Sequence, residues 1–201
     1  MKYTEIMKWF PQFTAKHDLA SEYCKYIHFS DKFTAVTNGF CLIVDDYIST
    51  HKHSEDNHGN EHPYITEFEQ NMRKTLDGFQ EYNWCGLDAE KVKCCTKLLS
   101  GLTDDAIYLK IDDGLHILSA DNNIQLSAVI HCECGTEPQG GVFSKSTILK
   151  ILTMLNKTSP LDSVAISISH EQYPLLKIAN IHTVVILSGL RIPPNHLLLK
   201  M

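Results

Sequence analysis

The sequence predicts an α+β protein assembled from a repeated unit, in which one helix is followed by a meander of three antiparallel strands. Two observations support this prediction. A helical pattern followed by three strand-like runs occurs three times along the 201 residues. Short turns rich in Asp, Asn or Gly separate strand-like runs within the copies. One helix and three strands cannot bury their own apolar face, so we expect the copies to pack side by side, with the helices on one side of the sheets.

The second copy, residues 88–130, is the most regular. Asp88 is a suitable N-cap for a helix that ends at Gly101. Strand-like runs follow at residues 106–111, 115–118 and 124–130, and the turns 112–114 and 121–123 separate them. Of the adjacent residues Cys94 and Cys95, only one can face the core. The apolar residues that share one helix face are Val92, Cys95, Leu98 and Leu99.

The third copy begins at Phe143. Ser146 is the expected N-cap of its helix. Strand-like runs follow at residues 164–168, 175–178 and 183–187. The helix presents one apolar face, formed by Ile148, Leu152 and Leu155.

The first copy is less regular. Residues 3–16 have a helical pattern, but Pro11 should break or kink the helix, because proline lacks the backbone donor that a helix interior needs. Strand-like runs occupy residues 24–29, 33–37 and 40–44. The last two are joined by Asn38-Gly39, a strong signal for a tight hairpin.

Residues 49–84 separate the first and second copies. They open with a polar, histidine-rich loop, residues 50–63, followed by an amphipathic helix that must bury a face. We therefore interpret this segment as an insertion. The predicted domains are residues 1–134, with two units and the insertion, and residues 135–201, a third unit that is half of a second domain. The apolar residues of the inserted helix are Ile65, Phe68, Met72 and Leu76.

Composition and charge exclude several classes of protein. A net charge of −6 argues against a general polyanion binder, although lysines can still gather on one face. No apolar run approaches the roughly 18 residues of a membrane span, and the first residues do not form a signal peptide. Seven cysteines without the spacing of a disulfide framework favour reduced thiols. We expect a cytoplasmic protein without membrane contact.

The sequence contains no nucleophile elbow, no phosphate-cradling glycine loop and no His-Glu-x-x-His helix. The carboxylate pairs Asp45-Asp46 and Asp112-Asp113 lie at predicted strand ends, where turns favour Asp. We therefore predict no catalytic residues, no cofactor and no enzyme activity.

Two clusters of histidine or cysteine are candidate metal sites. One loop contains His51, His53, His58 and His62, and another contains Cys132 and Cys134. Neither has a zinc-finger spacing, so a solvated histidine-rich loop is favoured over a metal site. A small metal-binding regulator is the third alternative for the function of the chain.

Helix-then-meander units paired into domains resemble the construction of sliding clamps, and short motifs match as well. Residues 35–42, Ala-Val-Thr-Asn-Gly-Phe-Cys-Leu, are similar to the Thr-Asp-Gly-His-Arg-Leu turn in the middle domain of the bacterial β clamp. Residues 87–130 resemble the other half of that domain. Residues 143–191 are similar to the closing half of the last domain, with Ser188-Gly189-Leu190-Arg191 where the family has Met-Pro-x-Arg. The chain thus resembles a short, divergent member of the DNA polymerase III beta subunit family.

This resemblance implies a processivity or docking factor that holds double-stranded DNA without reading its bases. A clamp chain of the family has six units and a ring normally has twelve, so three copies imply a homo-oligomer. The helices of the family face the DNA. The lysines that lie away from the apolar helix faces are Lys8, Lys16, Lys93, Lys97, Lys150 and Lys157.

The resemblance also implies a hydrophobic cleft for short peptides from DNA polymerase or other clamp-binding proteins. Phe40 and Cys41 replace the His-Arg pair of the family, which would make the cleft more apolar. The alternative is a clamp-derived protein–protein interaction module that does not encircle DNA. The cleft residues implied by the resemblance are Thr37, Gly39, Phe40, Leu42, Leu187, Leu190 and Arg191.

Overall fold

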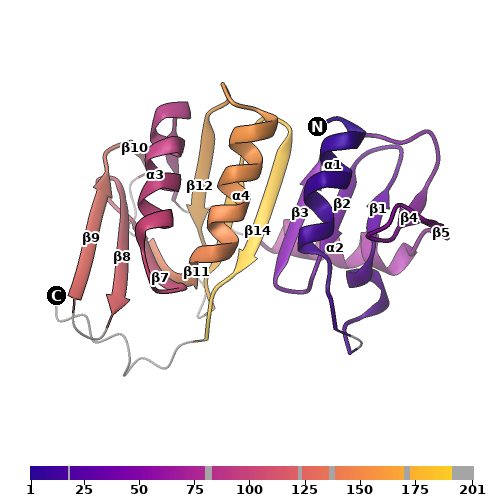
Figure 1. Ribbon diagram of the computed structural model, residues 1–201, viewed down its shortest axis with the longest axis horizontal. Helices are drawn as coiled ribbons and strands as arrows, with labels where there is room; N and C mark the ends of the chain where they lie inside the picture. The colour runs from indigo at the N-terminus through magenta and orange to yellow at the C-terminus, as the bar shows by residue number, and fades with distance from the viewer. Residues whose placement is uncertain (18, 80–82, 122–123, 136–138, 170–172, 192–201) are drawn as a thin grey trace. The chain divides into compact units, whose positions relative to one another are not determined.

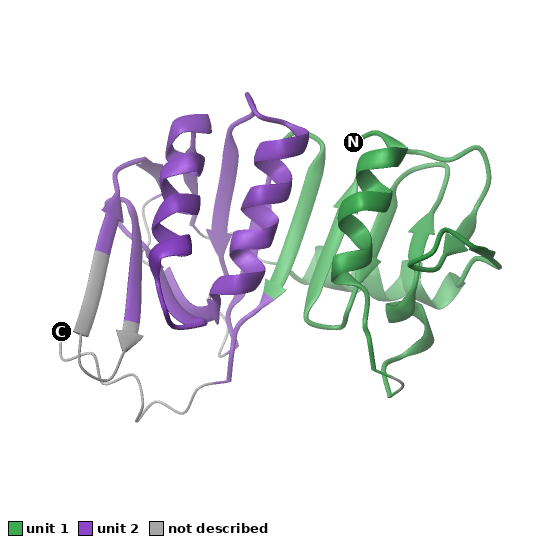
Figure 2. Cartoon of the chain, viewed as in Figure 1, with its two compact units in different colours: residues 1–79, 181–187 green, residues 80–180, 188–201 purple. Residues whose placement is uncertain are grey.

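The computed structural model describes residues 1–17, 19–79, 83–121, 124–135, 139–169 and 173–191 (Figure 1). The chain forms two compact units. Unit 1 contains residues 1–79 and 181–187, and unit 2 contains residues 80–180 and 188–201 (Figure 2). Unit 1 therefore joins the start of the chain to a segment close to its end.

Unit 1 begins with helix α1 (Tyr3–Trp9). The chain then tightens into the 3-10 helix η1 (Phe10–Phe13), with Pro11 in its first turn. The predicted break of the 3–16 helix at Pro11 is thus confirmed, and its physical reason is that proline is tolerated only where a helix starts. A second 3-10 helix, η2 (Glu22–Lys25), replaces the first part of the predicted strand 24–29.

The strands of unit 1 form a sheet in the order β14-β3-β2-β1-β4-β5. The hairpin β2 (Thr34–Thr37) and β3 (Cys41–Asp45) was predicted, as were β1 (Ile27–Phe29) and β14 (Thr183–Ser188). The short strands β4 (His53–Glu55) and β5 (Glu61–His62) lie inside the histidine-rich loop and were not predicted. β14 pairs with β3, so Ile186 lies opposite Leu42. The last strand of the third copy thus extends the sheet of the first copy.

The inserted helix α2 (Thr66–Gly78) confirms the predicted amphipathic helix. Phe68 and Met72 are buried in a cluster with Phe33, Ala35 and Leu42, and Leu76 packs against the same cluster. Phe68 and Met72 account for most of the helix's stabilisation, since full burial of such a side chain contributes roughly 1.5–3 kcal/mol.

Unit 2 contains the long helices α3 (Ala89–Gly101) and α4 (Lys145–Thr158). Asp88 caps α3, as predicted, and its Oδ1 accepts a hydrogen bond of 2.9 Å from the Lys91 N–H. The cap of α4 is Ser144 and not Ser146, because the Ser144 hydroxyl accepts the Thr147 N–H at 3.3 Å. The two helices lie side by side in front of the strands of unit 2 in Figure 1.

Two four-stranded arrangements support these helices. One has the order β11-β7-β8-β9, and unit 2 also contains the run β10-β6-β12-β13. The predicted strands are present, but three shorter or glycine-containing ones were missed: β6 (Cys85–Leu87), β10 (Glu133–Cys134) and β11 (Gln139–Ser144). The predicted strands are β7 (Ala106–Ile111), β8 (Leu115–Asp121), β9 (Ile124–Ile130), β12 (Val164–Ile168) and β13 (Leu175–Ala179).

The α+β fold class and the repeated helix-plus-meander pattern are confirmed. The boundary between the two compact units differs from the predicted domains 1–134 and 135–201. β11 pairs with β7 and β12 pairs with β6, so the second copy and the third copy without its last strand form one unit. The first copy, its insertion and β14 form the other. Among the helices that the structure describes, none has the length and apolar character needed to cross a membrane.

Candidate functional site

The helices α3 and α4 concentrate positive charge in an acidic chain. α3 contains three lysines and one glutamate, and α4 contains three lysines and no acidic residue. Together they have a formal charge of +5, whereas the whole chain has −6. Helical periodicity predicts the lysines individually, whereas the contrast with the rest of the chain appears only when the charges of the two helices are summed.

The outward side chains of these helices form a surface that we call the helical face of unit 2: Lys93, Lys97, Lys150 and Lys157, all exposed. The other two lysines of the helices are engaged locally. Lys91 pairs with Asp88 at 3.2 Å, and the Lys145 ammonium donates to the Leu102 carbonyl at 2.7 Å. Within the part of the chain that the structure describes, the four lysines of the helical face form no ion pair. They are therefore available to an external anion.

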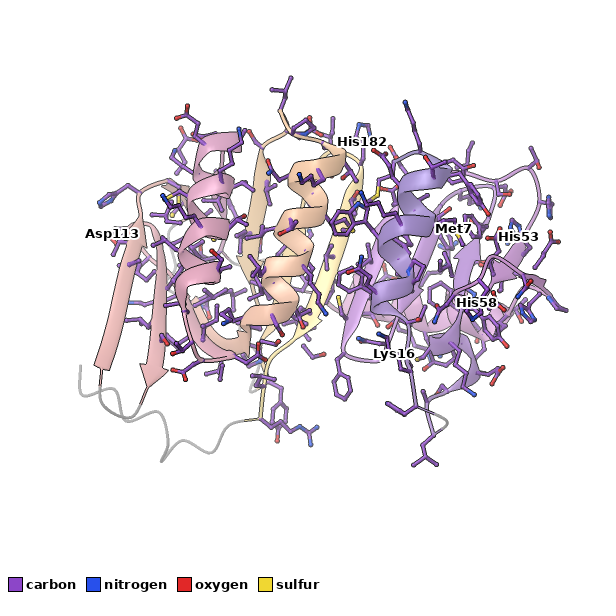
Figure 3. The ribbon with its side chains drawn as sticks, viewed as in Figure 1. Met7, Lys16, His53, His58, Asp113 and His182 are labelled. Carbon is purple, nitrogen blue, oxygen red and sulfur yellow. The ribbon has the colours of Figure 1, made fainter. Side chains whose placement is uncertain are left out.

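The two remaining predicted lysines lie in unit 1. Lys8 is exposed on α1, with its ammonium 5.6 Å from the centroid of the Trp9 ring. Lys16 is also exposed, beyond the end of η1 (Figure 3). α1 contains one glutamate, Glu5, for its one lysine, so it has no net charge. The positions of lysines recur in all three copies, but the excess of positive charge does not extend to α1.

An apolar groove of about 520 Å³ runs beside α3, between this helix and strands β8 and β9. Leu98, which the sequence assigns to the buried helix face, is only half-buried and lines this groove instead. Cys94 is exposed here, whereas its neighbour Cys95 is buried, as expected for adjacent helical residues. The residues that line the groove are Cys94, Lys97, Leu98, Gly101, Leu102, Ile117 and Ala128.

The β2–β3 turn in unit 1 is built by side-chain hydrogen bonds. The Asn38 side-chain oxygen accepts the N–H groups of Phe40 at 3.0 Å and Cys41 at 2.8 Å, and the Thr37 hydroxyl accepts the Gly39 N–H at 3.1 Å. Gly39 has a φ of +88°, a conformation that other residues rarely adopt. The turn holds the Phe40 side chain 69% exposed, which makes it an apolar anchor point on the surface.

Strand pairing brings the end of β14 beside this turn, since Leu187 lies opposite Cys41. This places Thr37, Gly39, Phe40, Leu42 and Leu187 of the predicted cleft together in unit 1. Leu42 and Leu187 are only 6% and 3% exposed, however. Leu42 lies opposite Ile186 and Leu187 opposite Cys41, so the two leucines point to opposite faces of the sheet. Phe40 is therefore the exposed apolar side chain of this set.

The last two predicted cleft residues lie in unit 2. Leu190 is partly exposed, and its N–H donates to the Val142 carbonyl at 2.8 Å. The Arg191 guanidinium lies 4.7 Å from the centroid of the exposed Tyr173 ring, a cation–π contact. Position 189, just before these two residues, requires glycine, because a Cβ at Gly189 would approach the Pro174 carbonyl oxygen to 2.7 Å.

The carboxylate pairs of the sequence have structural partners. Oδ2 of buried Asp45 accepts the Thr183 hydroxyl at 2.6 Å, and Oδ2 of Asp46 lies 2.7 Å from Nδ1 of His182. Asp112 accepts the Lys110 ammonium at 2.7 Å. Asp45 also fills the predicted turn role, because its Oδ1 accepts the Tyr47 N–H at 3.0 Å. The contacts with Thr183 and His182 are long-range and were not predicted.

The histidine-rich loop does not gather all four of its histidines. His58 is exposed in a turn where its N–H donates to Asp56 at 2.8 Å. The His62 ring lies 4.8 Å from the ring of Tyr26. His51 and His53 do lie together, with ring centroids 4.5 Å apart. In unit 2, the thiols of Cys132 and Cys134 are 3.7 Å apart.

Comparison with known proteins identifies the fold. No protein-family model matches the chain, and no curated protein matches its sequence. The DNA polymerase III beta subunit of Borrelia burgdorferi has a TM-score of 0.71 at 9% identity, over 94% of this chain and 62% of that one. The DNA polymerase sliding clamp of Pseudomonas aeruginosa has 0.71 at 10% identity, over 94% and 64%.

A sliding clamp from Bartonella birtlesii has a TM-score of 0.70 at 11% identity, over 94% of this chain and 64% of that one. The chain therefore has the sliding-clamp fold that its repeats and motifs predict. It spans less than two thirds of the length of these clamps.

Proposed function

We propose that this chain is a non-catalytic, sliding-clamp-like processivity or docking factor that associates with double-stranded DNA without sequence preference. The observation that carries the proposal is the formal charge of +5 on α3 and α4 within a chain of −6. Such a contrast confines attraction for phosphate to one surface of an otherwise repulsive molecule.

The helical face of unit 2 suits backbone contact and not base recognition. Its four lysines are flexible point charges on helices, and each can neutralise a phosphate without reading a base edge. Binding by this surface releases condensed counterions and weakens steeply with salt.

The surface around Phe40 is proposed as a docking site for a client peptide. An exposed aromatic ring on a turn fixed by three side-chain hydrogen bonds is a rigid apolar anchor. Leu190 and Arg191 of unit 2 belong to the same proposal through their resemblance to the end of a clamp chain. The proposed occupants are short peptides from a DNA polymerase or another clamp-binding protein.

Self-association is part of the proposal, because the three helix-plus-meander copies are half of the six that the resemblance implies for a clamp chain. The test is the solution mass by light scattering, with and without a primed circular DNA. We expect an oligomer that is retained on circular DNA and lost when the DNA is linearised. A monomer that ignores both forms of DNA would contradict the proposal.

A protein–protein interaction module without DNA encirclement is the second candidate. It is favoured by α1, which has no net charge and so does not continue the positive surface of α3 and α4. The same experiment separates the two candidates, since an interaction module would leave circular and linear DNA equally unbound.

A further inference from the structure

Four side chains share one face of the β4–β5 ribbon in unit 1. Alternate residues of a strand point to the same side, so His51, His53 and Glu55 are aligned along β4 and the segment before it. β5 contributes Glu61, which lies directly opposite Glu55 in the strand register. The short hairpin therefore brings two imidazoles and two carboxylates together, although 10 residues separate His51 from Glu61.

Three of these residues offer ligand atoms to a common point. One ligand atom from each of His51, His53 and Glu61 lies within 4.8 Å of the others. Nε2 of His51 is already 3.3 Å from Oε1 of Glu61. Ligand atoms around a tetrahedral zinc ion are roughly 3.4 Å apart, given metal–ligand bonds of about 2.0–2.2 Å. His51 and Glu61 are exposed, so both can make the small rotations that close the set.

His53 is held in position before any ion binds. It is only 7% exposed, and its ring stacks on Phe29 with a centroid distance of 4.7 Å and an interplanar angle of 5°. Its Nε2 lies 2.9 Å from Oε1 of Glu55, and the other oxygen of Glu55 accepts the Tyr3 hydroxyl at 2.9 Å. The nitrogen left for an ion is Nδ1, which lies 3.2 Å from the His51 carbonyl oxygen, so zinc binding must displace that contact. In zinc sites, a histidine that binds the metal through one ring nitrogen commonly donates a hydrogen bond from the other nitrogen to a carboxylate, which orients the ring.

We propose that His51, His53 and Glu61 form a Zn²⁺ site that is open to solvent, with Glu55 as the carboxylate that orients His53. Two imidazoles and one carboxylate are a ligand set that zinc accepts with a remaining position for water. Hard ions such as Mg²⁺ prefer all-oxygen sets and are not expected to compete. The ion would tie the segment before β4 to β5. The proposal is independent of any role in DNA binding.

The test is a zinc titration of the full chain, after chelator treatment and dialysis, against a chromophoric zinc chelator. We expect one equivalent of zinc to bind, without competition from millimolar Mg²⁺. Because His51 and Glu61 are exposed, His51→Ala and Glu61→Gln should fold normally and each weaken zinc binding at least 10-fold. Glu55→Gln should weaken it by roughly 10–100-fold, as for other orienting carboxylates.

The matched control is His58→Ala, which removes another exposed histidine of the same loop that lies outside the cluster (Figure 3). Its zinc affinity should stay within twofold of the original chain. Equal weakening by His58→Ala and His51→Ala would show unspecific capture by a histidine-rich loop and overturn the proposal. Binding of less than one equivalent by the unaltered chain would overturn it as well.

Discussion

The Thr183 hydroxyl donates a 2.6 Å hydrogen bond to Oδ2 of Asp45, and both side chains are buried. Their residues also lie opposite each other in the pairing of β14 with β3, although 138 positions separate them in the chain. A charge-assisted hydrogen bond inside the protein thus joins the last described strand to the first copy of the repeat.

Thr183→Val should destabilise the protein by about 1–3 kcal/mol, because it keeps the shape of the side chain but leaves a buried carboxylate oxygen without this donor. Urea unfolding at pH 7 would measure the change. Thr103→Val, at an exposed position, is the matched control and should stay within about 0.5 kcal/mol. Equal effects of the two substitutions would show that the Asp45–Thr183 contact contributes no specific stability.

Gly39→Ala should destabilise the β2–β3 turn by about 1–2 kcal/mol, because the φ of +88° places a Cβ against the following carbonyl. Gly78→Ala is the opposite case. Gly78 is the last residue of α2, and a Cβ there would meet nothing within 4 Å. The Gly78→Ala substitution should raise the stability by about 0.4–1 kcal/mol, because alanine lowers the conformational entropy of the unfolded chain. The midpoint of urea unfolding should fall for Gly39→Ala and rise for Gly78→Ala. A shift of both midpoints in the same direction would contradict this prediction.

Stability should fall by about 2 kcal/mol between pH 7 and pH 5 because of His28 alone. Burial lowers the pKa of His28 to about 4 from its usual 6.5, despite the contact of Nε2 with the Tyr23 carbonyl. The unfolded chain therefore takes up a proton as the pH falls through 6.5, while the folded protein does so only near pH 4. The stabilisation present above pH 6.5 is lost over that window.

Unfolding in urea at the two pH values would measure this loss. His28→Gln removes the titrating group and should reduce the pH dependence by about 2 kcal/mol. His17→Gln, at an exposed position, is the matched control. An unchanged profile in His28→Gln would show that other groups cause the loss.

Native alkylation should distinguish the adjacent cysteines of α3. Cys94 is exposed, whereas burial raises the pKa of Cys95 to about 12, so Cys95 has almost no thiolate at neutral pH. We expect iodoacetamide to modify Cys94 well before Cys95, as read by mass spectrometry of the peptides. Both should react equally in urea. Equal rates in the folded protein would place α3 in a different rotation.

The local features of this fold could be predicted from the sequence, since they depend on neighbouring residues. The Asp88 cap, the break at Pro11 and the Asn38-Gly39 turn each follow from the chemistry of one or two side chains. The division into units could not be predicted, because it depends on the pairing of β14 with β3 across most of the chain. The pattern predicts Ser146 as the cap although Ser144 fills that role, because a serine suits an N-cap at either position.

The candidate sites show the same distinction. Exposure of the lysines follows from helical periodicity, so Lys93 and Lys97 could be identified from the sequence. The ligand set of the zinc site could not, because Glu61 joins His51 and His53 only through the register of β4 and β5. Histidine spacing alone suggested His58 and His62 equally.

Removal of the four lysines of the helical face should weaken DNA binding and reduce its dependence on salt. The variant is Lys93→Gln, Lys97→Gln, Lys150→Gln and Lys157→Gln combined. If all four contact phosphates, the slope of log affinity against log salt should become shallower by up to about 3.6, at roughly 0.9 for each contact. Fluorescence anisotropy with a labelled duplex at several salt concentrations would measure the slope.

The control must change the net charge equally, because any loss of four positive charges weakens attraction to DNA at a distance. Lys2, Lys32, Lys52 and Lys74 are exposed in unit 1, and their combined substitution by Gln provides this match. It should lower affinity modestly and leave most of the salt slope intact. If both variants lose the slope alike, the attraction comes from total charge, and α3 and α4 have no special part in it. A loss confined to the helical face would identify these two helices as the DNA-contacting surface.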